Sequence, residues 1–203
     1  MKLTDIYDDL AKLYGNQHGE MVFTFSDKGS MHSYIDFYES YLQKKIQDAS
    51  LLEIGMMTGG SMLLWKKYFR QYRLVGLDIN TSWNQSRPFQ AELENDPDIT
   101  LLFGKNSLEP IPDEIKDQSF DFVIDDGDHR AMSQMETFRN YWPLVAPGGT
   151  YFIEDVIGPT QIDILTKFLE DQRRQNQCTF DVMHYKGFKN NRADDQILAV
   201  TRT

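Results

Sequence analysis

Cysteine and long apolar runs are both scarce in this sequence. Its 203 residues include one cysteine, Cys178, so no disulfide can form within the chain. No apolar stretch approaches the roughly 20 residues that are needed to span a bilayer. The segment from Met1 to Leu13 is rich in aspartate and lacks the basic and apolar regions of a signal peptide. We therefore expect a cytoplasmic protein with no membrane partner.

Positive charge is also in short supply. The 21 Lys and Arg residues are outnumbered by 31 Asp and Glu residues, which gives a net charge of −10. A surface of this sign repels nucleic acids and acidic lipids, so neither is an expected partner. Hydrophobic residues make up 40% of the chain and charged residues 26%, which excludes a disordered or low-complexity protein. The length suits one compact domain.

Short apolar runs alternate with helix-length segments from residue 50 onward. This alternation predicts an α/β fold of the Rossmann-like kind, in which helices flank a mostly parallel sheet. Two further extended segments near the C-terminus predict an antiparallel addition at one edge. The expected strands are Leu51 to Ile54, Leu74 to Asp78, Ile99 to Phe103, Phe122 to Asp125, Thr150 to Ile153, Thr179 to Tyr185 and Gln196 to Thr201.

Helical spacing of apolar residues marks the segments between these strands and the beginning of the chain. Residues 1–49 are expected to hold N-terminal helices and a loop from Tyr14 to His32 that acts as a lid over a substrate, while residues 50–203 form the catalytic domain. The expected helices are Thr4 to Leu13, Ser33 to Ile46, Ser61 to Phe69, Ser86 to Glu94, Met132 to Trp142 and Thr160 to Arg174.

A glycine-rich turn from Gly55 to Ser61 follows the first apolar strand and opens a helix. Its glycines permit tight backbone turns, and a helix N-terminus offers unpaired N–H groups to a ligand. The turn lacks the GxGxxG pattern of dinucleotide sites, and Glu53 favours a ligand with hydroxyl or cationic groups over a phosphate. Asp78 ends the next strand, where it is placed to accept hydrogen bonds from a ribose. A nucleoside-containing cofactor is the interpretation, although Asp78 could instead cap a helix.

Acidic residues gather at the ends of two later strands. The run from Asp125 to Asp128, followed by His129, comes directly after one strand, and Glu154 with Asp155 comes after the next. If the two strands are neighbours, Asp126, Glu154 and Asp155 converge as oxygen ligands for Mg2+, Mn2+ or Ca2+. His129 lies beside them as a candidate base. The alternative is helix capping and a solvated acidic rim.

Taken together, the motifs resemble the class I S-adenosylmethionine-dependent methyltransferases, and among them the metal-dependent sugar O-methyltransferases of macrolide biosynthesis. The resemblance runs from about Asp27 to Val156. It rests on Ser26-Asp27-Lys28-Gly29 with His32 and Tyr34, the turn Leu51 to Ser61, Trp65, Gly76-Leu77-Asp78-Ile79, Ile124-Asp125-Asp126-Gly127 with His129, Pro147-Gly148-Gly149 and Tyr151 to Asp155.

The resemblance implies a role for each matching residue. Asp126, Glu154 and Asp155 would bind Mg2+ or Mn2+, and His129 would act as the base. S-adenosylmethionine would be held by Glu53, Gly55, Gly59, Ser61, Asp78, Ser107 and Asp125. Three positions depart from the family pattern: Asp128 stands where serine is usual, Ser133 where a second histidine is common, and Lys105 where an acidic residue is expected.

The implied reaction is methyl transfer from S-adenosylmethionine to a hydroxyl of a small, sugar-like acceptor. A catechol or phenol acceptor satisfies the same metal geometry, and a silent protein that binds S-adenosylmethionine without turnover is an alternative of another class. A dinucleotide oxidoreductase is the remaining alternative. The sequence leaves a homo-oligomer open and does not identify the acceptor.

Overall fold

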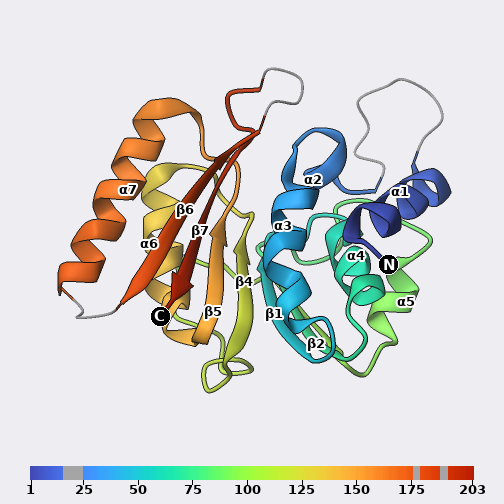
Figure 1. Ribbon diagram of the computed structural model, residues 1–203. Helices are drawn as coiled ribbons and strands as arrows, with labels where there is room; N and C mark the ends of the chain where they lie inside the picture. The colour runs from blue at the N-terminus through green and yellow to red at the C-terminus, as the bar shows by residue number, and fades with distance from the viewer. Residues whose placement is uncertain (16–24, 176–178, 188–191) are drawn as a thin grey trace.

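A seven-stranded sheet forms the middle layer of the molecule (Figure 1). The computed structural model describes residues 1–15, 25–175, 179–187 and 192–203. The strands are β1 (Ala49–Ile54), β2 (Tyr72–Asp78), β3 (Ile99–Phe103), β4 (Phe120–Asp125), β5 (Val145–Ile153), β6 (Phe180–Lys186) and β7 (Gln196–Arg202). They lie in the order β3-β2-β1-β4-β5-β7-β6.

The first five strands are parallel, and the last two form an antiparallel pair. Strand β7 pairs antiparallel with β5, and β6 is the outer strand. The predicted fold class, a Rossmann-like sheet that is mostly parallel with an antiparallel edge, is therefore confirmed.

Helices cover both faces of the sheet. They are α1 (Leu3–Tyr14), α2 (Asp27–Ser30), α3 (Tyr34–Leu42), η1 (Gln43–Lys45), α4 (Gly60–Tyr68), α5 (Gln90–Glu94), α6 (Ala131–Tyr141), η2 (Trp142–Leu144) and α7 (Gly158–Gln175). None of the helices in the described ranges is long and apolar enough to cross a membrane.

Alternating strand residues separate two apolar clusters, one on each face of the sheet. On β1, Leu51 packs with the residues of α1, α3 and α4, while Leu52 packs with those of α6 and α7. The N-terminal helices thus share a core with the sheet. This arrangement holds α1 and α3 against one face of the sheet.

Part of the predicted lid is ordered secondary structure. Residues 27–30 form the short helix α2. Lys28 within this helix is only 1% exposed, and His32, just after it, is only 2% exposed. Residues 16–24 of the predicted loop, with His18, lie outside the described residues. Buried polar side chains at Lys28 and His32 require partners inside the protein, and these partners define the site below.

Candidate active site

A cleft of about 660 Å³ opens at the carboxyl ends of the parallel strands. Its walls include the ends of β1 and β2 at Ile54 and Leu77, together with Asp126 from the loop after β4. The strand order reverses between β1 and β4, so this crevice lies at the topological switch point where α/β sheets bind ligands. Its volume is within the range that small-molecule sites occupy.

The glycine turn between β1 and α4 forms one wall of the cleft. Gly55 has a φ of +91°, and a Cβ atom there would lie 2.0 Å from the carbonyl oxygen of Asp126. Only glycine allows the two loops to approach this closely. Gly60 begins α4 and also lines the cleft, so the N-terminus of that helix lies at the cleft wall, where its N–H groups could meet a ligand.

Asp78 fixes the shape of this turn. One of its carboxylate oxygens accepts hydrogen bonds from the backbone N–H groups of Met56 and Met57, each at 2.9 Å. The other accepts from the backbone N–H of Asn80 at 2.8 Å and from its side chain at 2.7 Å. Asp78 lines the cleft as the ribose hypothesis requires, and the structure adds a second role, which is to hold the glycine turn in place.

The residues predicted to bind a cofactor divide into two groups. Gly55, Ser61, Asp78 and Ser107 line the cleft. Glu53, Gly59 and Asp125 are not among its lining residues: Glu53 and Asp125 are buried beneath it, and Gly59 packs against the ring of Trp83. Their assignment to the cofactor stays a prediction.

The two buried carboxyl groups have protein partners. Glu53 accepts a hydrogen bond from the indole N–H of Trp65 at 3.0 Å, and the hydroxyl of Tyr151 lies 3.4 Å from Asp125. Burial raises the pKa of Asp125 to about 8.

The acidic cluster predicted at the strand ends does form, and it contains a cation that belongs to the chain. The ammonium of Lys28 lies 2.7 Å from Asp126 Oδ2, 2.7 Å from Glu154 Oε1 and 3.4 Å from Glu53 Oε1. The hydroxyl of Tyr38 donates a short hydrogen bond to the same oxygen of Glu154. Burial alone would lower the pKa of Lys28, but the three carboxylates raise it well above its usual range, so the ammonium is charged.

The three predicted metal ligands are therefore not equivalent. Asp126 and Asp155 line the cleft, and single ligand atoms of Asp126, His129 and Asp155 lie within 4.8 Å of one another. Glu154 is 1% exposed, is not among the lining residues, and directs its carboxylate toward Lys28 and Tyr38. Two carboxylates thus face the cleft beside an imidazole, and their oxygen atoms are ligands that suit Mg2+ or Mn2+.

Asp155 has an unusual backbone. Its φ of +51° lies in the left-handed region, which non-glycine residues adopt at a cost and which is frequent at functional sites. Burial, with Asp126 nearby, raises the pKa of its carboxyl to about 8. A bound cation would favour the ionised form of this group.

His129 lies where a base can reach the cleft. Its Nε2 atom is 3.9 Å from Asp155 Oδ2, and its side chain is 38% exposed. Its Nδ1 atom is buried and has no hydrogen-bond partner among the described residues. Within the described ranges neither ring nitrogen is engaged in a hydrogen bond, so the ring is available to a molecule bound in the cleft.

Two of the departures from the family pattern form a pair. The hydroxyl of Ser133 donates to Asp128 Oδ2 at 2.8 Å, and the guanidinium of Arg130 holds both oxygens of the same carboxylate. The third departure, Lys105, lines the cleft and pairs with Glu114 at 3.2 Å.

Sequence reasoning missed several residues of the site. Lys28 and Tyr34 stand within the motifs that carry the resemblance, and the position of Lys28 in Ser26-Asp27-Lys28-Gly29 was the available signal. Tyr38 lies within the predicted helix Ser33 to Ile46 with no sign of a role in the site, and nothing in the local sequence pointed to Asp194, which also lines the cleft. These residues are brought to the site by tertiary packing.

The segment 52–156 matches a protein-family model that is described as a methyltransferase domain. Among curated proteins, the chain is similar to 8-demethyl-8-alpha-L-rhamnosyl tetracenomycin-C 2'-O-methyltransferase of Streptomyces olivaceus, with 30% identity over 142 residues that cover 64% of this chain and 35% of that protein. It is similar to demethylmacrocin O-methyltransferase of Streptomyces fradiae, with 29% identity over 63% of this chain and 33% of that protein. The chain thus spans about a third of the length of these relatives.

Solved structures show the same fold. The MycE methyltransferase from the mycinamycin biosynthetic pathway, in complex with Mg, SAH and mycinamycin VI, superimposes with a TM-score of 0.66 at 22% identity and covers 97% of this chain and 54% of that one. The N-methyltransferase NodS from Bradyrhizobium japonicum WM9 gives a TM-score of 0.54 at 18% identity, covering 83% of this chain and 92% of that one.

Proposed function

Because this chain belongs to the family of methyltransferase domains, we propose that it moves a methyl group from S-adenosylmethionine to a hydroxyl of a sugar-containing small molecule, with a divalent cation bound in the cleft. The resemblance to class I methyltransferases of the macrolide type, predicted from the sequence, is confirmed by the family match and the named relatives. S-adenosylmethionine is the methyl donor of this family. The acceptor and the cation are the proposed parts.

One observation carries the proposal: Asp126, His129 and Asp155 meet in the cleft that the glycine turn borders. The glycine turn and Asp78 form one wall, suited to a nucleoside. The acidic group forms another wall, suited to a cation and to a hydroxyl beside it. A methyl donor and an acceptor held on these two walls would occupy a single cavity, as direct transfer requires.

The chain's own residues supply the chemistry around the donor and the cation. Asp126 and Asp155 would hold Mg2+ or Mn2+, and Lys28 keeps the carboxylate of Asp126 in position. When bound, such a cation lowers the pKa of an alcohol and orients it. His129 would take the hydroxyl proton as the new bond between oxygen and the methyl carbon forms. The bond between that carbon and sulfur breaks, and its electron pair stays on sulfur.

The relatives point to the class of acceptor. The names of the curated proteins that this chain resembles describe methylation of hydroxyl groups on rhamnosyl, macrocin and mycinamicin compounds. A sugar hydroxyl is not acidic, so a base and a bound cation both assist its methylation, and the cleft presents a candidate base, His129, beside carboxylates that could hold a cation. We therefore propose a glycoside as acceptor.

The test is methyl transfer from S-adenosylmethionine that carries a deuterated methyl group. A simple rhamnoside and a catechol serve as alternative acceptors, and products are detected by mass spectrometry with Mg2+ or with a chelator. We expect a heavier rhamnoside that disappears when the chelator is present. Product from the catechol alone would replace the sugar by a phenol as acceptor, and calorimetric binding of S-adenosylmethionine without any product would favour a silent protein.

The role of His129 is tested separately. His129→Ala is expected to keep the affinity for S-adenosylmethionine nearly unchanged and to lower turnover by about 10²- to 10⁴-fold, the usual contribution of a general base. His184→Ala is the matched control, because His184 lies on β6 and is not among the residues that line the cleft. Equal turnover of the His129 variant and the wild type would reject the assignment.

A further inference from the structure

The imidazole of His32 buries a nitrogen that has no hydrogen-bond partner among the described residues. Its side chain is 3% exposed, and its Nδ1 atom lies 3.5 Å from Asp155 Oδ1 and 3.8 Å from Asp195 Oδ1. Both distances are too long for an N–H···O hydrogen bond. A buried polar atom without a partner costs about 1–3 kcal/mol. A nitrogen that faces carboxylate oxygens at this separation leaves room for a positive ion between them.

Neighbouring groups hold this nitrogen in a fixed position. The ring of His32 stacks on the ring of Tyr34, with centroids 4.8 Å apart and planes 19° apart. The Tyr34 hydroxyl lies 2.9 Å from Asp155 Oδ1 and 2.8 Å from the carbonyl oxygen of Asp194. Tyr34 therefore orients the ring of His32 and contacts both Asp155 and Asp194. In metalloproteins, residues that hydrogen-bond or pack against the metal ligands orient them in the same way.

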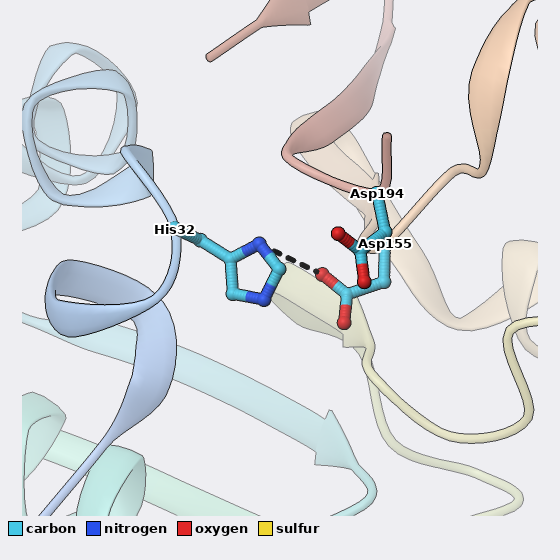
Figure 2. Close-up of side chains that lie close together, drawn as sticks. All are labelled: His32, Asp155 and Asp194. Carbon is cyan, nitrogen blue, oxygen red and sulfur yellow. Dashed lines mark ion pairs between the residues drawn. The ribbon is translucent and has the colours of Figure 1, made fainter. Parts of the chain in front are cut away.

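We propose that His32, Asp155 and Asp194 form a second divalent-cation site, separate from the Asp126 and His129 side of the cleft and selective for a transition-metal ion such as Mn2+. Figure 2 shows the histidine approaching from the turn between α2 and α3. Asp155 comes directly after β5, and Asp194 comes just before β7. One ligand atom from each of the three residues lies within 4.8 Å of the others. All three residues line the cleft.

The spacing is close to what an ion requires. Ligand atoms that are about 2.1 Å from one octahedral ion lie about 3.0 to 4.2 Å apart. The distance from His32 Nδ1 to Asp155 Oδ1, 3.5 Å, is within this range, and no two of the three ligand atoms are more than 4.8 Å apart. An imidazole nitrogen favours Mn2+ and other transition-metal ions over Mg2+, which prefers oxygen ligands alone.

The local charge also favours a cation. Within the described part of the chain, the ion-pair partners of Asp155 are the two histidines, His32 and His129. Arg192 neutralises Asp194, with its Nε atom 2.8 Å from Oδ1. Each carboxylate oxygen keeps a second lone pair for a metal ion. Lys28 forms its direct ion pairs with Glu53, Asp126 and Glu154.

Asp155 would serve both sites. Its Oδ1 atom faces His32, and its Oδ2 atom faces His129 at 3.9 Å. A carboxylate can bridge two ions with its two oxygens, as it does in two-metal enzymes. The second site goes beyond the proposed function, because methyl transfer as proposed above needs one cation only.

The experiment counts Mn2+ ions on the metal-free protein by isothermal titration and by the loss of the free Mn2+ signal in electron paramagnetic resonance. We expect two ions on the wild type and one on His32→Gln. Asp126→Asn should also retain one ion, and Asp155→Asn should lose both. His184→Gln, which removes an imidazole outside the cleft, should retain two. Asp194→Asn removes another ligand of the same site. If His32→Gln does not fold, the ion count on Asp194→Asn is used in its place, and one ion is expected.

Two results would overturn the inference. One is a single ion on the wild type that His32→Gln and Asp194→Asn leave in place, which would remove the second site and leave the proposed function intact. The other is two ions whose affinities do not change in either variant. The count does not depend on turnover, so a protein without methyltransferase activity can still support or reject this site.

Discussion

Replacement of Lys28 by methionine tests how the acidic cluster is held together. The ammonium lies within 3.4 Å of three carboxylates and is 1% exposed, so its loss leaves their charges buried without compensation. Breaking a buried ion pair by removing one partner costs about 3–5 kcal/mol. Lys28→Met replaces the four-atom apolar stem of the lysine by one of similar length and removes the ammonium, so the effect measures charge more than packing. We expect the free energy of unfolding in urea, without divalent ions, to fall by that amount.

Added Mg2+ should recover part of the loss. Without Lys28, the carboxylates of Asp126 and Glu154 can both turn to an ion, so the variant should gain more from Mg2+ than the wild type does. At an ion concentration 100 times the dissociation constant, binding stabilises the folded state by about 2.7 kcal/mol. The gap between variant and wild type should therefore narrow when Mg2+ is present.

The matched control is Lys12→Met. Lys12 is 76% exposed and pairs with Asp9 at 3.3 Å on the surface, where an ion pair is worth about 0–1 kcal/mol. A Lys28 variant that stays within about 1 kcal/mol of the wild type would refute the reasoning, because removing one partner of a buried ion pair costs about 3–5 kcal/mol.

Three further changes probe the scaffold of the site. Asp121→Asn weakens hydrogen bonds from Ser50 at 2.8 and 3.0 Å and should cost about 1–2 kcal/mol at pH 7. These contacts lower the pKa of Asp121 in the folded protein. Its contribution to the free energy of unfolding is therefore present above the unfolded pKa of about 3.9 and disappears as the pH falls below that value. Urea unfolding at a series of pH values measures this loss. Gly60→Ala places a carbon 1.6 Å from the carbonyl oxygen of Phe25 and should cost about 1–3 kcal/mol in thermal unfolding. Asp78→Ala removes the acceptor that orders the glycine turn and should weaken S-adenosylmethionine binding at least about tenfold by calorimetry, the equivalent of 1.4 kcal/mol.

For each of these three variants, one result would contradict the prediction. A constant difference between Asp121→Asn and the wild type from pH 7 to pH 2 would exclude the carboxylate as its origin. Gly127→Ala, whose added carbon meets only atoms at 3.5 Å, is the control for Gly60→Ala, and equal losses in both would show that the contact with Phe25 is unimportant. Unchanged affinity in Asp78→Ala would separate the glycine turn from cofactor binding.

Much of the fold could be predicted because its central strands, such as β1 and β4, are short apolar runs that are largely buried. All seven predicted strands are present, and the alternation along β1 places Leu51 and Leu52 in different clusters as a two-faced sheet requires. The helix α2 could not be predicted, since four residues carry too little periodicity. It forms because Phe25 and Lys28 on either side of its first residue are buried by distant parts of the chain.

The candidate site was predictable in part for the same reason. Glu154 and Asp155 follow one strand, Asp126 follows its neighbour, and parallel strands bring these ends together. The sequence could not show that Lys28 would form ion pairs with Asp126 and Glu154, because these residues are 98 and 126 positions away from it along the chain. His32 and Asp194 meet for a similar reason, through the packing of α3 and β7 beside the cleft. Such contacts are set by tertiary structure and leave no local pattern.

The most direct measurement is methyl transfer to a rhamnoside from S-adenosylmethionine with a deuterated methyl group, followed by mass spectrometry before and after removal of divalent ions. A product that is heavier by one deuterated methyl group, formed only with a divalent ion present, is the predicted result. Transfer that proceeds equally well in excess chelator would contradict the assignment of Asp126 and Asp155 to a cation that readies the hydroxyl.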